Sequence, residues 1–320
     1  MDVSTATQII AGGAGLDDEA ARVVRLSGGA SRTTSMIETV GGRRLIVQVA
    51  LRTERTVERS VRAEMALLRA AHQAGVAVPE VLAEREFDEA VGGSWALTTF
   101  VEGESIARRI QRDDAYATAR ERFADDCGRQ LARLHGIDGP ALDELDDTDQ
   151  VVMYRRVLDE LGHPSPAFEL GFRWLEEHRP PSAGHGLVHG DFRLGNLLIG
   201  PDGLTSVLDW ELAHLGDPME DLGWLCVRAW RFGGRPPVGG LGRLEDLLAA
   251  YDDECRVLGR DAVADPDHVR WWMVLGTLKW GVMCITQASR HLLDAGGTHE
   301  HAAIGRRVAE NEWDVMELIR

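Results

Sequence analysis

The chain has 320 residues, which is enough for one large domain or two smaller ones, each with a core of its own. Its formal net charge of −17 argues against general nucleic-acid binding, because that function requires a basic surface. An acidic surface favours a cationic partner, or simply keeps the protein solvated. The four cysteines are scattered and form no CxxC pair, which argues against a disulfide framework or a zinc ribbon and suits a reducing compartment.

No stretch of the sequence has the pattern of a membrane or export signal. Residues 1–8 lack the basic segment and apolar core of a secretory signal. Residues 271–285 are apolar, but Lys279 interrupts them and they are too short to cross a bilayer. We therefore expect a cytoplasmic protein with no membrane and no nucleic-acid partner.

The first third of the chain is rich in strand patterns. Strands are expected at 23–26, 33–40, 45–50, 81–84 and 94–100. The glycines at 41–42 separate the second and third of these runs, which predicts a hairpin. Apolar residues recur at helical spacing over 57–68, so one helix is expected there, ended by Gly75 and Pro79.

The rest of the chain has mainly helical patterns. Helices are expected around 123–134, 168–175, 219–231, 243–257, 267–290 and 301–319. The acidic run 143–149 is expected to be a solvated loop or, alternatively, a patch for a cationic substrate. We predict an α+β chain with a small β-rich lobe over 1–103, a hinge at about 98–104 and a larger, mainly helical lobe over 104–320.

The segment 187–211 carries the strongest chemical signal. Two short apolar runs flank the turn sequence Gly-Pro-Asp-Gly at 200–203, in which Asp-Gly favours a tight hairpin turn. With Asp202 and Gly203 at the centre of the turn, Asn196 would lie opposite Asp209 at the open end of the hairpin.

Three polar groups are therefore expected to converge where the hairpin opens. An amide oxygen beside a carboxylate is a hard oxygen site that suits Mg²⁺, so Asn196 and Asp209 are candidate metal ligands. Asp191 lies just before them, in a loop tight enough to need Gly190 and Gly195. The alternative for the whole set is a polar hairpin with a buried aspartate.

The catalytic-loop pattern of kinases is present in this segment. His189-Gly190-Asp191 is followed by Asn196, five residues after the aspartate, and this resembles the His-Arg-Asp loop and the later asparagine of protein kinases. The sequence Leu-Asp-Trp-Glu at 208–211 follows. With it, the pattern resembles the superfamily of aminoglycoside phosphotransferases, choline kinases and fructosamine kinases.

The resemblance covers most of the chain. It extends through Gly216-Asp217-Pro218 and Asp221-Leu222, is strong over 187–225 and is weaker before residue 105. The most similar branch is the one related to the kinase-like domain of acyl-CoA dehydrogenase fusion proteins. The resemblance implies a protein-kinase-like two-lobed fold and an ATP- and Mg²⁺-dependent transfer of the γ-phosphate to a hydroxyl of a small molecule.

The resemblance also implies a role for each residue of the loop. Asp191 would accept the proton of the substrate hydroxyl, and Asn196 and Asp209 would hold Mg²⁺ against the phosphates. His189 is expected to be a scaffold residue rather than a proton carrier. Arg193 would contact phosphate or substrate, or form a structural ion pair.

Three acidic residues follow the hairpin, and each is expected to support the site or to have no role in it beyond the fold. Glu211 would support the metal site or face solvent, and Asp221 would brace the catalytic loop from beneath. Asp217 precedes Pro218, and Glu220 follows, which is the pattern of a capped helix start. Capping is a sufficient explanation for Asp217.

The nucleotide side is less well marked. The glycine-rich run 27–31 would cover the phosphates with backbone N–H groups, although a plain β-turn looks the same. Glu64 would pair with a strand cation or lie on the surface, and the hinge at 98–101 would face the adenine. The expected nucleotide contacts are Gly28, Gly29, Ser31, Gln48, Glu64, Thr99, Phe100 and Val101.

Gln48 is where the sequence departs from the pattern of its relatives. They carry Lys or Arg near the end of this strand, and a glutamine cannot neutralise phosphate charge. Either Arg44, Arg52 or a residue from elsewhere takes this role, or the chain is a catalytically weak or inactive nucleotide-binding homologue.

The acceptor and the assembly are not specified by the sequence. Trp271, Trp272 and Trp280 are expected in the core, or partly in an acceptor pocket, and the acidic run 252–254 could receive amines. The acceptor is expected to be a small hydroxylated molecule, either cationic or a hydroxyacyl compound, and a homodimer is compatible with the sequence. A rival interpretation is a metallohydrolase that uses Asp191, Asp209 and histidines such as those in the expected loop 299–301.

Overall fold

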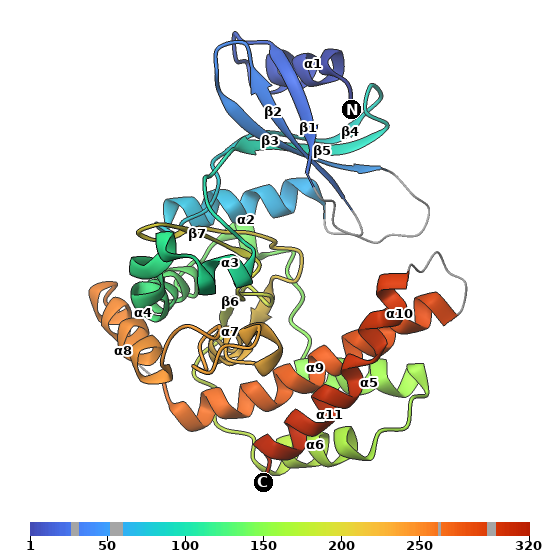
Figure 1. Ribbon diagram of the computed structural model, residues 1–320, viewed down its shortest axis with the longest axis vertical. Coiled ribbons are helices and arrows are strands. Elements are labelled where there is room, and N and C mark those ends of the chain that lie inside the picture. Colours follow the sequence, from blue (N-terminus) through green and yellow to red (C-terminus); the bar gives the residue numbers. More distant parts are fainter. Residues whose placement is uncertain (27–31, 52–59, 262–263, 293–298) are drawn as a thin grey trace.

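The structure is a computed structural model that describes residues 1–26, 32–51, 60–261, 264–292 and 299–320, without the side chains of residues 51, 300 and 301. A β-sheet with two helices forms one end of the molecule, and a larger body of helices forms the other (Figure 1). This is the two-lobed α+β arrangement that the sequence predicts. The boundary at 103–104 stays a prediction.

The smaller lobe is an antiparallel sheet of five strands in the order β1-β2-β3-β5-β4. The strands are β1 (Ala20–Arg25), β2 (Thr33–Thr39), β3 (Arg44–Leu51), β4 (Val81–Asp88) and β5 (Gly93–Thr99). The hairpin predicted at 41–42 joins β2 to β3, with Thr39 N donating to Arg43 O at 2.9 Å. Alternate side chains of these strands point into a buried core, as period-two patterning requires.

Two helices cover this sheet (Figure 1). Helix α1 (Val3–Gly13) buries Ile9 and Ile10 against Trp95 and Leu97 of β5. Helix α2 (Val61–Gln73) corresponds to the helix expected over 57–68, and its Met65 and Leu67 belong to the core that continues into the larger lobe. Residue 57 itself lies outside the described residues.

The larger lobe is mainly helical. Its elements are α3 (Ala107–Arg112), η1 (Asp114–Tyr116), α4 (Ala117–Leu134), η2 (Pro140–Leu142), α5 (Gln150–Leu161), α6 (Pro166–Glu177), α7 (Met219–Leu225), η3 (Arg228–Arg231), α8 (Leu244–Val257), α9 (Pro266–Leu292), α10 (His299–Gly305) and α11 (Arg307–Leu318). Helix α9 is buried along most of its length, and Trp271 and Trp272 are in the core as expected. The run 143–149 is a loop, also as expected.

Several elements differ from expectation. The helix expected over 219–231 is α7 followed by the separate turn η3, and α1, α3 and α5 are not among the expected helices. The run 299–301 was expected in a loop, but α10 begins at His299. The helix packs on α9, and Gly305 approaches it so closely that an added Cβ would lie 2.9 Å from Ala288 Cβ. This tertiary contact is invisible in the local sequence. Nothing in the described residues brings His299 to the aspartates of the catalytic loop.

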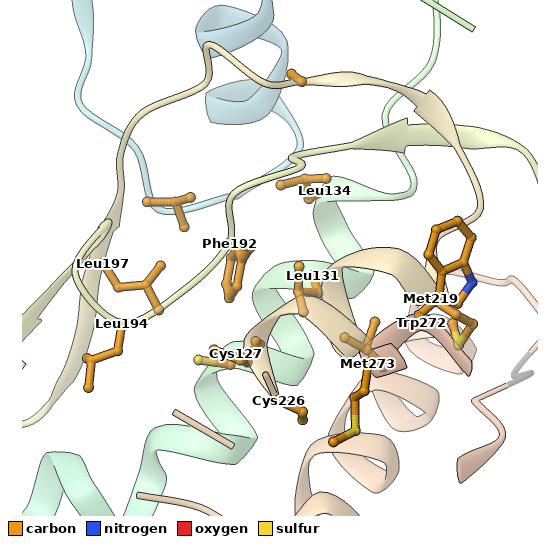
Figure 2. Packing of buried hydrophobic residues seen from close by; sticks show 14 of the residues in the cluster. Cys127, Leu131, Leu134, Phe192, Leu194, Leu197, Met219, Cys226, Trp272 and Met273 are labelled. Carbon is orange, nitrogen blue, oxygen red and sulfur yellow. The ribbon is translucent and has the colours of Figure 1, made fainter. Parts of the chain in front are cut away.

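Two short sheets, each of two strands, hold the segment that contains the catalytic-loop pattern. Strand β6 (Gly186–Val188) pairs with β9 (His214–Gly216), and β7 (Leu197–Gly200) pairs with β8 (Gly203–Val207). Between β6 and β7, Phe192 and Leu194 enter the core cluster that holds Cys127 and Leu131 of α4 (Figure 2). These apolar anchors fix the backbone of the loop, so its polar residues have little freedom to move.

The link between the lobes is bonded to the β7-β8 hairpin. Glu104 N donates to Ile199 O at 2.9 Å, and Ile199 N donates to Glu104 O at 3.0 Å. A Cβ on Gly103 would lie 2.7 Å from Leu198 Cβ, so the close approach requires a glycine there.

Within the described parts of the chain, no helix combines the length and the apolar character needed to cross a bilayer.

Candidate active site

The β7-β8 hairpin has a different register from the one expected. Leu197 lies opposite Val207 and Gly200 lies opposite Gly203, so Pro201 and Asp202 are the central turn residues. Proline is preset for the first central position of a turn, and this preference wins over the Asp-Gly signal. The expectation of Asp202 and Gly203 at the centre is therefore wrong.

An extra residue also enters the second strand. Thr205 is bulged out of the pairing, and its hydroxyl donates to Glu102 O at 2.8 Å in the link between the lobes. As a consequence Asn196 faces Leu208, whose N–H donates to Asn196 O at 2.8 Å, and not Asp209. The predicted pairing of Asn196 with Asp209 is thus wrong by one residue, although both residues line the same cavity.

A cavity of about 540 Å³ between the lobes brings most of the predicted residues together. Of the expected residues, its lining contains Gln48, Glu64, Thr99, Phe100, Val101, Asn196, Asp209 and Glu211. Asp209 reaches the lining through a left-handed backbone, with φ of 66°. The loop residues Gly28, Gly29 and Ser31 lie outside the described residues. Asp191 is not part of the lining, but it is hydrogen-bonded to Asn196, which is.

Asp191 is held by three donors. Asn196 Nδ2 donates to its Oδ2 at 2.6 Å, while Trp224 Nε1 and Arg193 Nε each donate to its Oδ1 at 2.8 Å. The residue is only 8% exposed, so these bonds fix the direction of its remaining lone pairs. Of the two roles considered for Arg193, the structure contains the ion pair, with Asp191 as its partner. Trp224 is a contact that the sequence motifs did not indicate.

Asp221 supports the loop from below, as expected. Its carboxylate accepts the N–H of His189 at 2.7 Å and of Gly190 at 2.9 Å, and lies 3.1 Å from His135 Nε2. Complete burial acts to raise the pKa of Asp221, but the hydrogen bond and charge of His135 and the other donors outweigh burial and leave the pKa lowered.

His189 has the geometry of a scaffold residue. Its Nε2 lies 3.1 Å from Leu208 O, and its Nδ1 accepts the N–H of Asp191 at 3.2 Å. These partners require a neutral ring with the proton on Nε2. Burial lowers the pKa of His189, which favours the same neutral form.

The helix start at Asp217 is confirmed in its capping role. Asp217 Oδ1 accepts the N–H of Met219 at 2.9 Å, and its Oδ2 accepts the N–H of Ala183 at 3.0 Å. Glu220 is buried and ion-paired with Lys279 at 3.2 Å and with His214 at 3.1 Å. These residues build the floor of the loop and do not reach the cavity between the lobes.

Negative charge accumulates around Asp209. Its carboxyl group faces the cavity but is largely enclosed by protein, and this burial, together with the carboxylates of Glu211 and Asp191, raises the pKa of Asp209 to about 6. A cation beside Asn196 and Asp209 would relieve this repulsion.

The oxygen donors of Asn196 and Asp209 suit Mg²⁺ better than they suit a metal whose ligands all come from the protein. The described residues contain no group of three or more His, Cys, Asp or Glu side chains in a metal-binding arrangement. Mg²⁺ typically takes one or two protein oxygens and completes its shell with phosphate and water oxygens. Asn196 and Asp209 fit that requirement.

The ion pair of the nucleotide side uses an arginine that the sequence analysis missed. Glu64 is buried and binds Arg32 Nη1 at 2.5 Å. Arg32 lies just before β2, and Gln48 on β3 lies opposite Thr34 of β2, so both side chains line the same cavity. Arg32 therefore brings a positive charge to this cavity from the residue just before the neighbouring strand.

Arg44 and Arg52 are the two replacements considered for the missing strand cation, and the structure describes only Arg44. Arg44 stacks over the Phe100 ring at 4.4 Å and bonds to Glu102, so it faces the link between the lobes. Arg52 lies outside the described residues. The only local sign of Arg32 was its place directly after the glycine-rich run, and no motif points to it.

The acidic run on α8 is not part of the site. Glu254 pairs with Arg133 at 2.7 Å and with Arg129 at 3.3 Å, and Asp252 accepts the N–H of Ala264 at 3.1 Å. These bonds occupy the carboxylates that the sequence suggested as partners for amines.

Comparison with known proteins identifies the family of the chain. The profile of the phosphotransferase enzyme family (APH) matches residues 22–258. The chain belongs to this family. The chain is 31% identical over 178 residues to mouse (Mus musculus) acyl-CoA dehydrogenase family member 10, a match that covers 52% of this chain and 17% of the mouse protein. It therefore spans a small part of the length of this relative.

Solved structures show that the chain has a kinase-like fold. A protein from Ralstonia eutropha assigned as an aminoglycoside phosphotransferase aligns with a TM-score of 0.76 and 20% identity, over 99% of this chain and 98% of that chain. Spectinomycin phosphotransferase, solved with ADP and spectinomycin, aligns with a TM-score of 0.69 and 12% identity, over 99% of both chains. At these identities the likeness establishes the fold alone.

Proposed function

We propose that the chain transfers the γ-phosphate of ATP to a hydroxyl of a small molecule, with Asp191 as the general base and Asn196 and Asp209 as ligands of Mg²⁺. Membership of a phosphotransferase family supports the reaction class. The observation that carries the proposal is the hydrogen bond of 2.6 Å between Asn196 Nδ2 and Asp191 Oδ2, at the wall of the cavity that Asp209 lines. In this proposal, the hydrogen bond holds the base beside one of the two metal ligands, and the second ligand lines the same cavity.

Asp191 would orient the acceptor and take its proton. Its two oxygens already accept from Asn196, Trp224 and Arg193, and a carboxylate has further lone pairs for a substrate hydroxyl. Since phosphoryl transfer depends on positioning more than on covalent chemistry, this fixed carboxylate is the main contribution of the loop.

Asn196 and Asp209, the proposed metal ligands, would hold a cation that offsets the negative charge of the phosphates. When bound, Mg²⁺ supplies neutralisation of the phosphate oxygens. Asn196 is held from both sides, because its Nδ2 donates to Asp191 and its backbone O accepts from Leu208, so its amide oxygen is left for the metal.

The opposite wall of the cavity would hold the nucleotide. Val101 N–H has no hydrogen-bond partner among the described residues, and it lines the cavity at the link between the lobes, as an adenine contact requires. Arg32, held by Glu64, would supply the positive charge that Gln48 lacks. The ADP complex of spectinomycin phosphotransferase supports a nucleotide in this cleft.

The proposal is tested by measuring ADP formation from Mg·ATP on a panel of hydroxylated acceptors, with Asp191→Ala as control. We expect acceptor-dependent ADP formation in the natural chain and none above background in the variant, while a non-hydrolysable ATP analogue still binds to both. Gln48 favours a rival, the catalytically inactive nucleotide-binding homologue. Nucleotide binding without turnover on any acceptor would establish that rival instead.

We further propose that this reaction takes place in the cytoplasm, on a small molecule rather than on a nucleic acid. All four cysteines are free and buried, which supports a reducing environment. Expression of the tagged chain followed by cell fractionation tests the location.

A further inference from the structure

Helix α9 contains a buried lysine to which the proposed reaction gives no role. Lys279 interrupts the apolar run 271–285, and its side chain is only 3% exposed. A buried ammonium group costs free energy unless it is paired and hydrogen-bonded. The contacts of Lys279 therefore account for its place in an otherwise apolar part of the helix.

One of these contacts is a hydrogen bond to the catalytic loop. Lys279 Nζ donates to Gly190 O at 2.9 Å and to Glu220 Oε1 at 3.2 Å. The Gly190 carbonyl belongs to the peptide bond that leads into Asp191, and the Gly190 N–H donates to Asp221 at 2.9 Å. Both polar groups of the Gly190 backbone are thus held, one from α7 and the other from α9.

The ammonium group also lies over an indole ring that donates to the proposed base. Lys279 Nζ is 4.6 Å from the centroid of the Trp224 ring, and Trp224 Nε1 donates to Asp191 Oδ1 at 2.8 Å. A cation on the face of an aromatic ring draws the π electrons towards itself and away from the rim. Since the N–H lies on the rim, it becomes a stronger donor, and its bond to Asp191 is strengthened.

The charges around Lys279 favour the cation that this contact requires. Burial acts to lower the pKa of the Lys279 ammonium group. Tyr154 and the carboxylates of Glu220 and Asp191 outweigh burial and leave that pKa raised.

We propose that Lys279 is a positioning residue of the active site, which fixes the Gly190 carbonyl and strengthens the Trp224 N–H that holds Asp191. Lys279 lies outside the lining of the cavity between the lobes, so it acts through these two contacts. The effect on the rate rests on the proposed function. The effect on the Trp224 N–H does not, because it depends only on contacts within the fold.

The test variants are chosen to avoid an unpaired buried charge. Removal of Lys279 alone would take the ammonium group away from Glu220, and the loss of one partner of a buried ion pair strongly destabilises a fold. The reference variant is therefore Glu220→Gln, and the test variant combines Glu220→Gln with Lys279→Met. Lys279→Gln in the natural chain is a second test variant, which keeps a hydrogen-bond donor and removes the charge.

The matched control is His268→Gln. His268 is also a buried residue of α9, and it pairs with Asp217 at 3.2 Å, just before α7 and outside the catalytic loop. Its loss should loosen the contact between the two helices without affecting the Trp224 N–H. Thermal melting of every variant verifies that it is folded.

The first measurement does not depend on activity. Hydrogen exchange of the indole N–H groups is followed by NMR, and Trp224→Phe identifies the Trp224 signal. We expect this N–H to exchange at least about tenfold faster in the test variant than in Glu220→Gln, because a weaker bond to Asp191 opens more often. The Trp271 N–H, bonded to Leu175 O at 3.0 Å, is the internal control and should keep its rate.

The second measurement is ADP formation from Mg·ATP with an acceptor from the panel. We expect kcat to fall about tenfold between Glu220→Gln and the test variant, with KM for ATP unchanged, since a misplaced group lowers the rate of transfer. His268→Gln should keep its kcat. In a chain that already carries Trp224→Phe, loss of Lys279 should cost less than about threefold, because substitutions that act through one contact do not add.

Three results would overturn the inference: unchanged exchange of the Trp224 N–H, an equal acceleration in His268→Gln, or an unchanged kcat in an active chain. Its failure is distinguishable from failure of the proposed function. Faster exchange of the Trp224 N–H in a chain that forms no ADP keeps the support of Trp224 by Lys279 and rejects phosphoryl transfer. ADP formation with fully additive losses keeps phosphoryl transfer and rejects Lys279 as a positioning residue.

Discussion

The two sides of the cavity between the lobes are built in different ways. On the helical side, the residues expected for catalysis lie within one short segment, and buried partners such as Asp221 hold that segment from below. On the sheet side, Gln48 stands where a strand cation is expected, and Arg32, the residue just before β2, pairs with Glu64. A loop whose backbone geometry matters needs its residues at a fixed spacing, whereas a single positive charge can come from any neighbour that reaches the same cavity.

The largest effect is expected from a substitution of Asp191, on the helical side of the cavity. Asp191→Asn keeps the size of the side chain but removes the base, and loss of a general base costs about 10²–10⁴-fold in rate. We expect kcat to fall by that factor with nucleotide affinity nearly unchanged, measured by ADP formation and by calorimetry. The control is Asp202→Asn, an exposed aspartate in the hairpin turn. A fully active Asp191→Asn variant would remove Asp191 from the mechanism.

The sheet side of the cavity is tested by removing the positive charge of Arg32 and restoring a positive charge at position 48. Arg32→Gln should lower kcat/KM for ATP by about 10- to 100-fold, because a charge-assisted hydrogen bond to phosphate contributes about 1.5–3 kcal/mol. Adding Gln48→Lys to this variant should restore part of the loss, since β3 then carries the cation itself. The measurement is initial rate against ATP concentration. If Arg32→Gln has no effect on kcat/KM, the cation is supplied by another residue.

The link between the two sides should respond to a single methyl group. In Gly103→Ala the new Cβ would meet Leu198 Cβ at 2.7 Å and Thr205 Oγ1 at 2.8 Å, and overpacking of this kind costs about 1–3 kcal/mol. We expect a lower free energy of unfolding in urea. Gly12→Ala is the matched control, because nothing lies within 4 Å of a Cβ there and alanine is favoured in a helix. Equal stability of both variants would show that the link tolerates expansion.

The smallest expected effect is a change in how the free energy of unfolding depends on pH, and it arises from His189 on the helical side of the cavity. Burial lowers the pKa of His189 below its ordinary value of 6.5, so the unfolded chain binds a proton on this residue that the folded chain refuses. The stability associated with the neutral ring is present above pH 6.5 and is lost as the pH falls below it. His189→Gln should therefore flatten the decline of the unfolding free energy between neutral and mildly acid pH, by at most about 1.4 kcal/mol per pH unit. An unchanged slope would contradict the neutral scaffold role.

Much of the arrangement could be predicted from the sequence because its causes are local. Strand alternation, helical periodicity and the glycines at 41–42 are properties of neighbouring residues, and the hairpin they predict is present. The spacing of Asp191 and Asn196 is likewise a property of one loop. The signal failed at the β7-β8 turn, where Pro201 and the bond of Thr205 to Glu102 decided a register that Asp-Gly alone would have set differently.

By itself, therefore, the sequence determined the two-lobed fold and the family, and it predicted Asp191, Asn196 and Asp209 as the site, since each of these depends on residues close together in the chain. Only the tertiary structure decided that Arg32 faces Glu64, that Trp224 holds Asp191, and that Lys279 of α9 bonds to the Gly190 carbonyl. These contacts join segments far apart in sequence. Their partners are selected by packing and by the matching of charges in space, and no local pattern records either.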